Sequence, residues 1–310
     1  MGDTCLCGVR TRRLAAMRPA SAALQNKRVD FLRRGAAIIA ALCSLATGSL
    51  ARPLDEVVAS GTLRVISYSD NAPFSFEDQG AARGIDVDLG HAIARELGIK
   101  AEIVLRMQGE EVDDDIRANV WRGPLTGGGT GDLMLSVPID RALSLRNPEA
   151  VFGNAYFQER IAVAIHPDLT GPNPAFDVFK TQKIGVRLAT VSDYFLLSYQ
   201  DGVLINNVSH HVKPEAGAKE FAAKEIAALM GVRSELEMQL ARAGIDVPLV
   251  EPDMTGIVRR DWLLGMAWKE NSRDLGYAVQ AAVEKIRASG ELERICRTYG
   301  VTYMPPPPPK

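Results

Sequence analysis

Residues 84–105 read GIDVDLGHAIARELGIKAEIVL and hold a helix signal followed directly by a strand signal. Apolar residues from Leu89 to Leu97 recur at helical spacing, and Gly98 follows as a C-terminal stop. Residues 101–105 are then an apolar run typical of a strand. Because residues 63–66 form an earlier strand signal, the stretch predicts one βαβ unit with a right-handed crossover.

The alternation of strand and helix signals continues to the end of the chain and predicts an α/β fold with a largely parallel sheet. A linker rich in Pro and Gly at 166–174 indicates a domain boundary, after which the pattern restarts. The further strands are expected at 132–137, 160–165, 183–187, 203–206 and 262–268. The further helices are expected from Ser192, over 214–230, from a Ser234–Glu237 capping box to Gly244, from Ser272 to Gly290, and over 291–298.

The first 51 residues have the features of an export signal. Arg33 and Arg34 precede an uncharged stretch at 35–48, and the residues up to Ala51 offer a cleavage site for a signal peptidase. The apolar run is shorter than the roughly 20 residues of a membrane-spanning helix. The sequence thus predicts a periplasmic protein cleaved near Ala51, with Met17 as an alternative start and lipidation at Cys43 as an alternative fate.

Removal of this leader changes the charge and the cysteine content. It carries eight of the 36 basic and two of the 38 acidic residues, which leaves 28 and 36 and a formal net charge of −8. A surface of this sign argues against nucleic acid and anionic lipid as partners. Only Cys296 remains, so no internal disulfide can form, and its apolar neighbours favour packing over a role as nucleophile.

Signs of catalysis, metal binding or cofactor binding are weak. The four histidines lack the spacing of metal ligands, and His210–His211 is expected in a solvated loop. The glycine-rich loop at 127–131 lacks the Lys-Ser/Thr ending of a phosphate loop, so no nucleotide cofactor is predicted. The acidic run at 110–115 could supply a general acid, but a solvated helix start is the favoured interpretation. No catalytic residue is predicted.

Several short motifs together resemble family 3 of the bacterial extracellular solute-binding proteins. They occur in the family's order: Gly61-Thr62-Leu63-Arg64-Val65, Ala72-Pro73-Phe74-Ser75-Phe76, Gly84-Ile85-Asp86-Val87-Asp88-Leu89, Gly131-Asp132, Ala155-Tyr156-Phe157, Lys183-Ile184-Gly185-Val186, and a closing helical segment over 275–300. No single motif is specific, but the ordered set covers residues 60–300.

The resemblance implies the type II periplasmic binding protein fold, in which two α/β lobes joined by two hinge strands close on a ligand. The hinge strands are expected near 161–165 and 253–261. The implied organisation of this monomer is a leader at 1–51, a first lobe at 52–162 and 259–304, a second lobe at 163–258, and a Pro-rich tail at 305–310.

The resemblance also implies which residues bind the ligand. Phe74 stands where the family stacks an aromatic ring on ligand, although a core phenylalanine is the alternative. Arg141 comes about three residues before the family's carboxylate-binding arginine, and Arg233 is the one charge where the family has an acidic residue for the ligand ammonium. Thr190 could bind ligand at a helix start, with Ser192 as the helix cap. The remaining expected ligand-binding residues are Tyr68, Asn71, Trp121 and Ser136.

Three functions follow from these expectations. The first is capture of a small polar ligand for delivery to the membrane permease of an ABC-type importer. The second is an accessory role for a periplasmic quinoprotein (PQQ-dependent) alcohol dehydrogenase, because the Trp121 segment and the Ser136-Val137-Pro138 turn resemble a subgroup linked to such enzymes. The third, a dehydratase-like enzyme on the same fold, requires a catalytic carboxylate.

Overall fold

The computed structural model describes residues 52–254 and 260–308, all of which belong to one compact unit. The predicted leader and most of the second predicted hinge segment lie outside the described residues. Within them, no helix is long and apolar enough to cross a membrane.

The predicted βαβ unit is confirmed and forms one edge of the first lobe. Strand β1 (Thr62–Tyr68) leads through helix α3 (Ile85–Glu96) to β5 (Lys100–Arg106), and the two strands pair in parallel along their whole length. Gly98 follows α3 with φ 73°, a left-handed conformation that glycine adopts without strain. The inward residues of α3, Leu89 and Ile93, are fully buried, as their helical spacing predicts.

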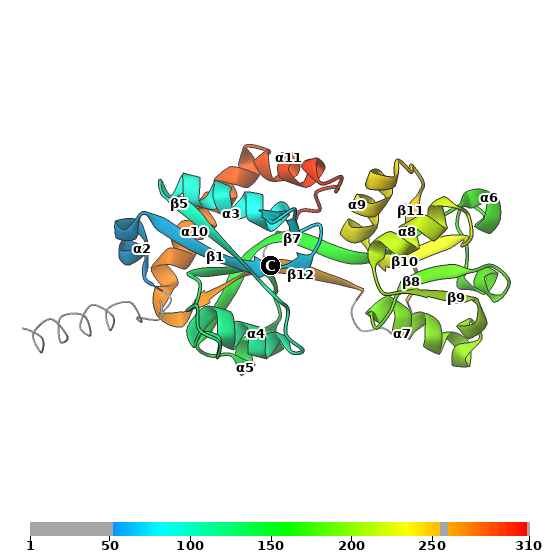
Figure 1. Ribbon diagram of the computed structural model, residues 1–310, viewed down its shortest axis with the longest axis horizontal. Coiled ribbons are helices and arrows are strands. Elements are labelled where there is room, and N and C mark those ends of the chain that lie inside the picture. Colours follow the sequence, from blue (N-terminus) through cyan, green and yellow to red (C-terminus); the bar gives the residue numbers. More distant parts are fainter. Residues whose placement is uncertain (1–51, 255–259, 309–310) are drawn as a thin grey trace, which may run out of the picture. The chain divides into compact units, whose positions relative to one another are not determined.

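The first lobe is a mixed sheet with helices on both faces. Its strand order is β5-β1-β6-β12-β7, with β6 parallel to β1 and β12 antiparallel to both of its neighbours. In Figure 1, α3 and α11 lie on one face of this sheet and α4 and α5 on the other. The further elements of this lobe are α2 (Leu54–Ser60), β2 (Asp70–Asn71), β3 (Ser75–Asp78), β4 (Ala81–Arg83), α4 (Val112–Ile116), a π-helical turn η1 (Arg117–Trp121), β6 (Leu133–Pro138), α5 (Arg141–Arg146), β12 (Asp261–Lys269), η5 (Glu270–Ser272), α10 (Arg273–Ala288) and α11 (Glu291–Thr298).

Strand β7 (Ala150–Ile165) belongs to the sheets of both lobes. Residues 150–160 pair with β12, whereas residues 161–165 pair with β10 of the second lobe. Asp261 opposite Arg160 begins β12, so the described part of the second crossing segment joins the sheet there. Side chains at 161–165 alternate between the two core clusters of the second lobe, as the pleat of a strand requires.

The sheet of the second lobe continues from β7 in the order β10-β8-β9, with helices on both faces. Strand β8 pairs in parallel with both β10 and β9, and β10 is antiparallel to β7. Figure 1 shows α8 and α9 on one face of this sheet and α7 on the other. Its elements are α6 (Pro167–Thr170), η2 (Phe176–Lys180), β8 (Ile184–Arg187), α7 (Val191–Ser198), η3 (Tyr199–Gly202), η4 (Ile205–Asn207), β9 (Val208–His211), α8 (Pro214–Ala222), β10 (Ala228–Val232), α9 (Arg233–Ala243) and β11 (Leu249–Val250).

Two predictions for the second lobe are wrong. The strand expected at 203–206 is a pair of 3-10 turns, and the strand itself is β9, which includes both histidines of the expected loop. The helix expected over 214–230 ends at Ala222 because residues from Ala228 onward pair with β8 and β7. Pairing on both sides there outweighs the helical propensity of an alanine-rich segment.

The residues just before the Pro-rich tail pack against the first lobe. The Gln158 backbone N–H donates a hydrogen bond to the Met304 carbonyl, and Tyr303 and Met304 pack against the main core. The predicted lobe boundaries, including the start of the tail at residue 305, stay a prediction.

Candidate functional site

A buried carboxylate is hydrogen-bonded to side chains of three first-lobe strands. Asp86, at the start of α3, is fully buried and accepts hydrogen bonds from Ser67 (2.8 Å), Ser136 (2.7 Å) and Tyr156 (2.6 Å). Burial raises its pKa, and these three hydroxyls oppose the rise. The family-like motif at 84–89 thus fixes Ser136 near the end of β6, where ligand contacts were predicted.

Two of the predicted ligand-binding residues meet at this turn. The Asn71 side-chain amide donates to the Ser136 hydroxyl at 3.1 Å, so the segment after β1 contacts the segment within β6. Ser136 has φ 57°, a left-handed conformation that is uncommon for residues other than glycine. Asn71 is half-buried and Ser136 is 6% exposed. The backbone is therefore held in a specific shape at the position that the sequence assigns to ligand.

Tyr68 and Phe74 are both buried. The Tyr68 hydroxyl donates to Asp115 at 2.9 Å, and burial raises the pKa of Tyr68. Phe74 is 4% exposed and packs edge-on against Phe157, with ring centroids 5.2 Å apart. Phe74 thus packs as a core phenylalanine, which was the alternative to stacking on ligand.

Trp121 and Arg141 lie at the ends of helical segments. Trp121 closes η1, is half-buried, and its indole N–H has no hydrogen-bond partner among the described residues. Arg141 begins α5 after the Asp140 cap and is exposed at a pocket of about 310 Å³. Gln158, Asp261 and Pro307 also line this pocket, so Arg141 faces the crossing strands and the tail.

The residue that caps helix α7 in the second lobe differs from the predicted one. Thr190, not Ser192, caps α7: its hydroxyl accepts from the Asp193 backbone N–H and donates to the Arg187 carbonyl at 2.8 Å. Ser192 instead lies inside the first turn, buried, and its hydroxyl has no partner among the described residues. Thr190 remains half-exposed at this turn.

The capping box predicted at Ser234 and Glu237 is also wrong. Helix α9 begins at Arg233, so Ser234 lies inside its first turn. The Ser234 hydroxyl and backbone N–H both donate to Glu159 of β7. Glu159 is 2% exposed, and its burial raises its pKa to about 7. The Arg233 guanidinium donates to Glu237 at 2.9 Å, so the charge expected to meet ligand is already paired.

The sequence analysis missed an acidic residue at the start of α9. Glu235 pairs with Arg187 at 2.9 Å, and its side chain is 15% exposed. Burial raises the pKa of Glu235, Arg187 opposes this rise, and the negative charges of Glu215 and Asp70 add to it. Asp70 and Glu215 therefore lie near enough to Glu235 to repel its negative charge, and Arg187 is its counterion. Glu235 was overlooked because this stretch was interpreted as a capping box. The residue lies just two positions beyond the interval in which an acidic residue was expected.

The residues considered for catalysis have structural partners. Cys296 is fully buried, and burial raises the pKa of its thiol to about 12, so it is packed as predicted. In the acidic run, Asp113 pairs with Arg146, Asp114 with Arg117, and Asp115 accepts from Tyr68. His210 lies 2.9 Å from Asp193, and the described residues contain no group of three potential metal ligands.

Part of the first lobe matches a known protein family. Residues 63–120 match the model of the bacterial extracellular solute-binding proteins, family 3. A curated relative, the cyclohexadienyl dehydratase of Pseudomonas aeruginosa, is 39% identical over 70 residues, which is 21% of this chain. The matched stretch spans 26% of that relative's length.

Solved structures resemble nearly the whole described chain. An ancestral cationic amino acid solute-binding protein has a TM-score of 0.63 at 21% identity, over 80% of this chain and 99% of its own. A Streptococcus pneumoniae amino acid ABC transporter substrate-binding protein bound to L-arginine has 0.54 at 19%, over 80% and 97%. The L-cysteine solute receptor of Neisseria gonorrhoeae has 0.51 at 17%, over 80% and 93%. The chain thus has the type II periplasmic binding protein fold, and residues 63–120 of its first lobe match the family 3 model.

Proposed function

We propose that this protein captures a small polar ligand carrying a cationic group between its two lobes and presents it to the permease of an ABC-type importer. The observation that carries the proposal is the partly buried Glu235 carboxylate, which pairs with Arg187 and whose negative charge is repelled by Glu215 of the same lobe and by Asp70 of the first lobe. Arg187 is the one counterion at hydrogen-bond distance from Glu235 among the described residues, so the three carboxylates carry a surplus of negative charge over it. An ammonium or guanidinium group would relieve that surplus through charge-assisted hydrogen bonds.

The first lobe supplies neutral polar groups to the same proposal. Asn71 and Ser136 meet at the end of β1 and β6, on the buried support of Asp86. Ligands of open α/β sheets bind beyond the carboxyl ends of parallel strands, which is where these residues lie. Two structural neighbours, a cationic amino acid solute-binding protein and a substrate-binding protein bound to L-arginine, support a cationic ligand.

Calorimetry and thermal melting against a panel of amino acids, amines and guanidines test the proposal. We expect at least one cationic compound to bind and raise the melting temperature, and Glu235→Gln to weaken that binding by about tenfold or more. Glu225→Gln, an exposed carboxylate on the same lobe, is the matched control and should leave binding unchanged. If the folded wild-type protein binds no compound of the panel, ligand capture is refuted.

The curated relative favours a second candidate function, a lyase reaction in the same site. The carboxylate best suited as general acid is Glu235, because burial raises its pKa. This candidate predicts turnover of cyclohexadienyl compounds that is lost in Glu235→Gln and kept in Glu225→Gln. Binding without turnover by the wild-type protein would exclude it.

A further inference from the structure

A second pocket lies wholly in the first lobe, on the side of the edge strand β5. It has a volume of about 490 Å³ and includes part of the glycine-rich loop that the sequence analysis singled out. Neither Glu235 nor any other residue of the proposed ligand site lines it. Its polar and glycine lining consists of Arg64, Arg106, Asp115, Asn119, Thr126, Gly127 and Gly128.

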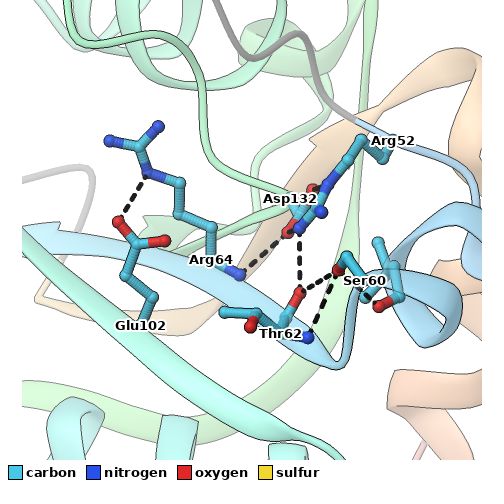
Figure 2. Close-up of polar contacts among 7 residues, drawn as sticks. Arg52, Ser60, Thr62, Arg64, Glu102 and Asp132 are labelled. Atoms are coloured by element: carbon cyan, nitrogen blue, oxygen red, sulfur yellow. Dashed lines mark hydrogen bonds and ion pairs between the residues drawn. The ribbon is translucent and has the colours of Figure 1, made fainter.

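Arg64 reaches this pocket from β1. Its backbone N–H donates to Asp132 at 2.8 Å, but that carboxylate is engaged in two hydrogen bonds with the Arg52 side chain. Figure 2 shows the Arg64 guanidinium directed away from Asp132, with its Nε towards Glu102 and no interaction drawn at its two terminal nitrogens. The Nε–Glu102 contact is 3.5 Å long, and the Glu102 side chain is 54% exposed. Solvent therefore weakens this ion pair.

Arg106 reaches the same pocket from β5 and has no carboxylate partner. Its terminal Nη2 donates to the carbonyl of Gly129 at 2.9 Å, which ties the strand to the glycine-rich loop. Its Nε is buried without a hydrogen-bond partner, and no carboxylate of the described residues lies within ion-pair distance of it. Burial lowers the pKa of Arg106, and the positive charge of Arg64 lowers it further.

The acidic residue of the lining, Asp115, offsets one of these two positive charges at most. Asp115 accepts hydrogen bonds from the Tyr68 hydroxyl and the Gly109 N–H, both at 2.9 Å, so both its oxygens have neutral donors. Two guanidiniums thus share one pocket, and one weak contact with Glu102 is their only ion pair among the described residues. The glycines at 127 and 128 add no side chain that would obstruct a ligand there.

We propose that Arg64 and Arg106 form a binding site for a small oxyanion, a phosphate or a carboxylate group, in this pocket. Guanidinium forks match the oxygens of both groups with paired hydrogen bonds, and an anion would relieve the repulsion between the two arginines. The terminal nitrogens of Arg64, at which Figure 2 draws no interaction, are donors that such an oxygen could accept from. The site is independent of the proposed function, because it uses no residue of the two-lobe ligand site.

Titration of the purified full-length chain with inorganic phosphate and, separately, with malonate tests this site, at ionic strength held constant with chloride. The side-chain Nε–H NMR signals of Arg64 and Arg106 report the site, and the melting temperature reports binding. We expect saturable shifts with at least one of the two anions. Saturation by phosphate or malonate alone would identify the preferred oxyanion, and response to neither would overturn the proposal.

Variants separate a built site from general charge screening. Arg106→Gln and Arg64→Gln should each weaken anion binding by about tenfold or more, whereas Glu102→Gln should strengthen it. Arg297→Gln, an exposed arginine on α11, is the control and should change nothing. If Arg106→Gln fails to fold, Arg64→Gln decides the outcome. Equal binding by wild type and the foldable Arg64 variant would contradict the site.

Discussion

The carboxylate of Asp86 accepts a hydrogen bond from the hydroxyl of Ser136 at 2.7 Å, across 50 residues of sequence. Ser136 in turn accepts from Asn71, so one buried anion fixes both first-lobe segments that were predicted to contact ligand. The family-like motif at 84–89 therefore supports the site. Its removal should affect both stability and binding.

Asp86→Ala should destabilise the fold by about 3 kcal/mol or more, because Ser67, Ser136 and Tyr156 would lose a buried acceptor. Asp86→Asn keeps one acceptor oxygen and should lose less. Chemical denaturation measures both, with Asp78→Ala at an exposed position as control. A loss in Asp86→Ala no larger than that in the control would show that the network contributes nothing.

Two substitutions at Ser136 distinguish the role of its hydroxyl from that of its backbone conformation. Ser136→Ala removes the hydrogen bond to Asp86 and keeps a side chain at φ 57°, whereas Ser136→Gly removes the hydroxyl but relieves the backbone. We expect the glycine variant to be more stable than the alanine variant by about 1 kcal/mol. The reverse order in a denaturant titration would count against a left-handed backbone at this turn.

Glu159 should make stability depend on pH near neutrality. Its pKa in the folded protein is about 7, against an ordinary value of 4.5, so the unfolded chain loses this proton first as pH rises. The contribution of Glu159 to the free energy of unfolding is greatest below pH 4.5, and it falls by about 3 kcal/mol as the pH rises to about 7. Glu159→Gln should remove that part of the pH dependence. Parallel stability curves for wild type and variant between pH 4 and 8 would contradict the assignment.

Gly276 in α10 leaves room for the ring of Trp268. A Cβ at Gly276 would lie 2.3 Å from that ring, whereas a Cβ at Gly231 would meet its nearest neighbour at 3.6 Å. Gly276→Ala should therefore cost about 1–3 kcal/mol through overpacking, and Gly231→Ala much less. Melting temperatures of the two variants provide the comparison, and equal values would disprove the close contact.

The sequence predicts the first lobe well because its signals are local. The helical spacing at 89–97 and the glycine stop at Gly98 specify α3 without knowledge of any other segment. The boundary between α8 and β10 could not be found in this way, because strand pairing with β7 and β8 decides it. A single sequence carries no direct record of such long-range pairing.

The candidate site was predicted only in part, for the same reason. Asn71 and Ser136 were expected at the site, and the structure brings them together. Phe74 is buried against Phe157, which is 83 residues away in sequence. The role of Glu235 at the site depends on its ion pair with Arg187 of strand β8. Neither partner can be identified from residue spacing.

The central claim is that the two lobes close on a ligand, and an inter-lobe distance measurement tests it most directly. Spin labels at Leu145→Cys on the first lobe and Tyr194→Cys on the second occupy exposed positions, and buried Cys296 with its raised pKa should not react. Cys5, Cys7 and Cys43 are replaced by serine. We predict that the cationic compound found by calorimetry shifts the distance distribution to shorter values. An unchanged distribution at saturating ligand would contradict closure.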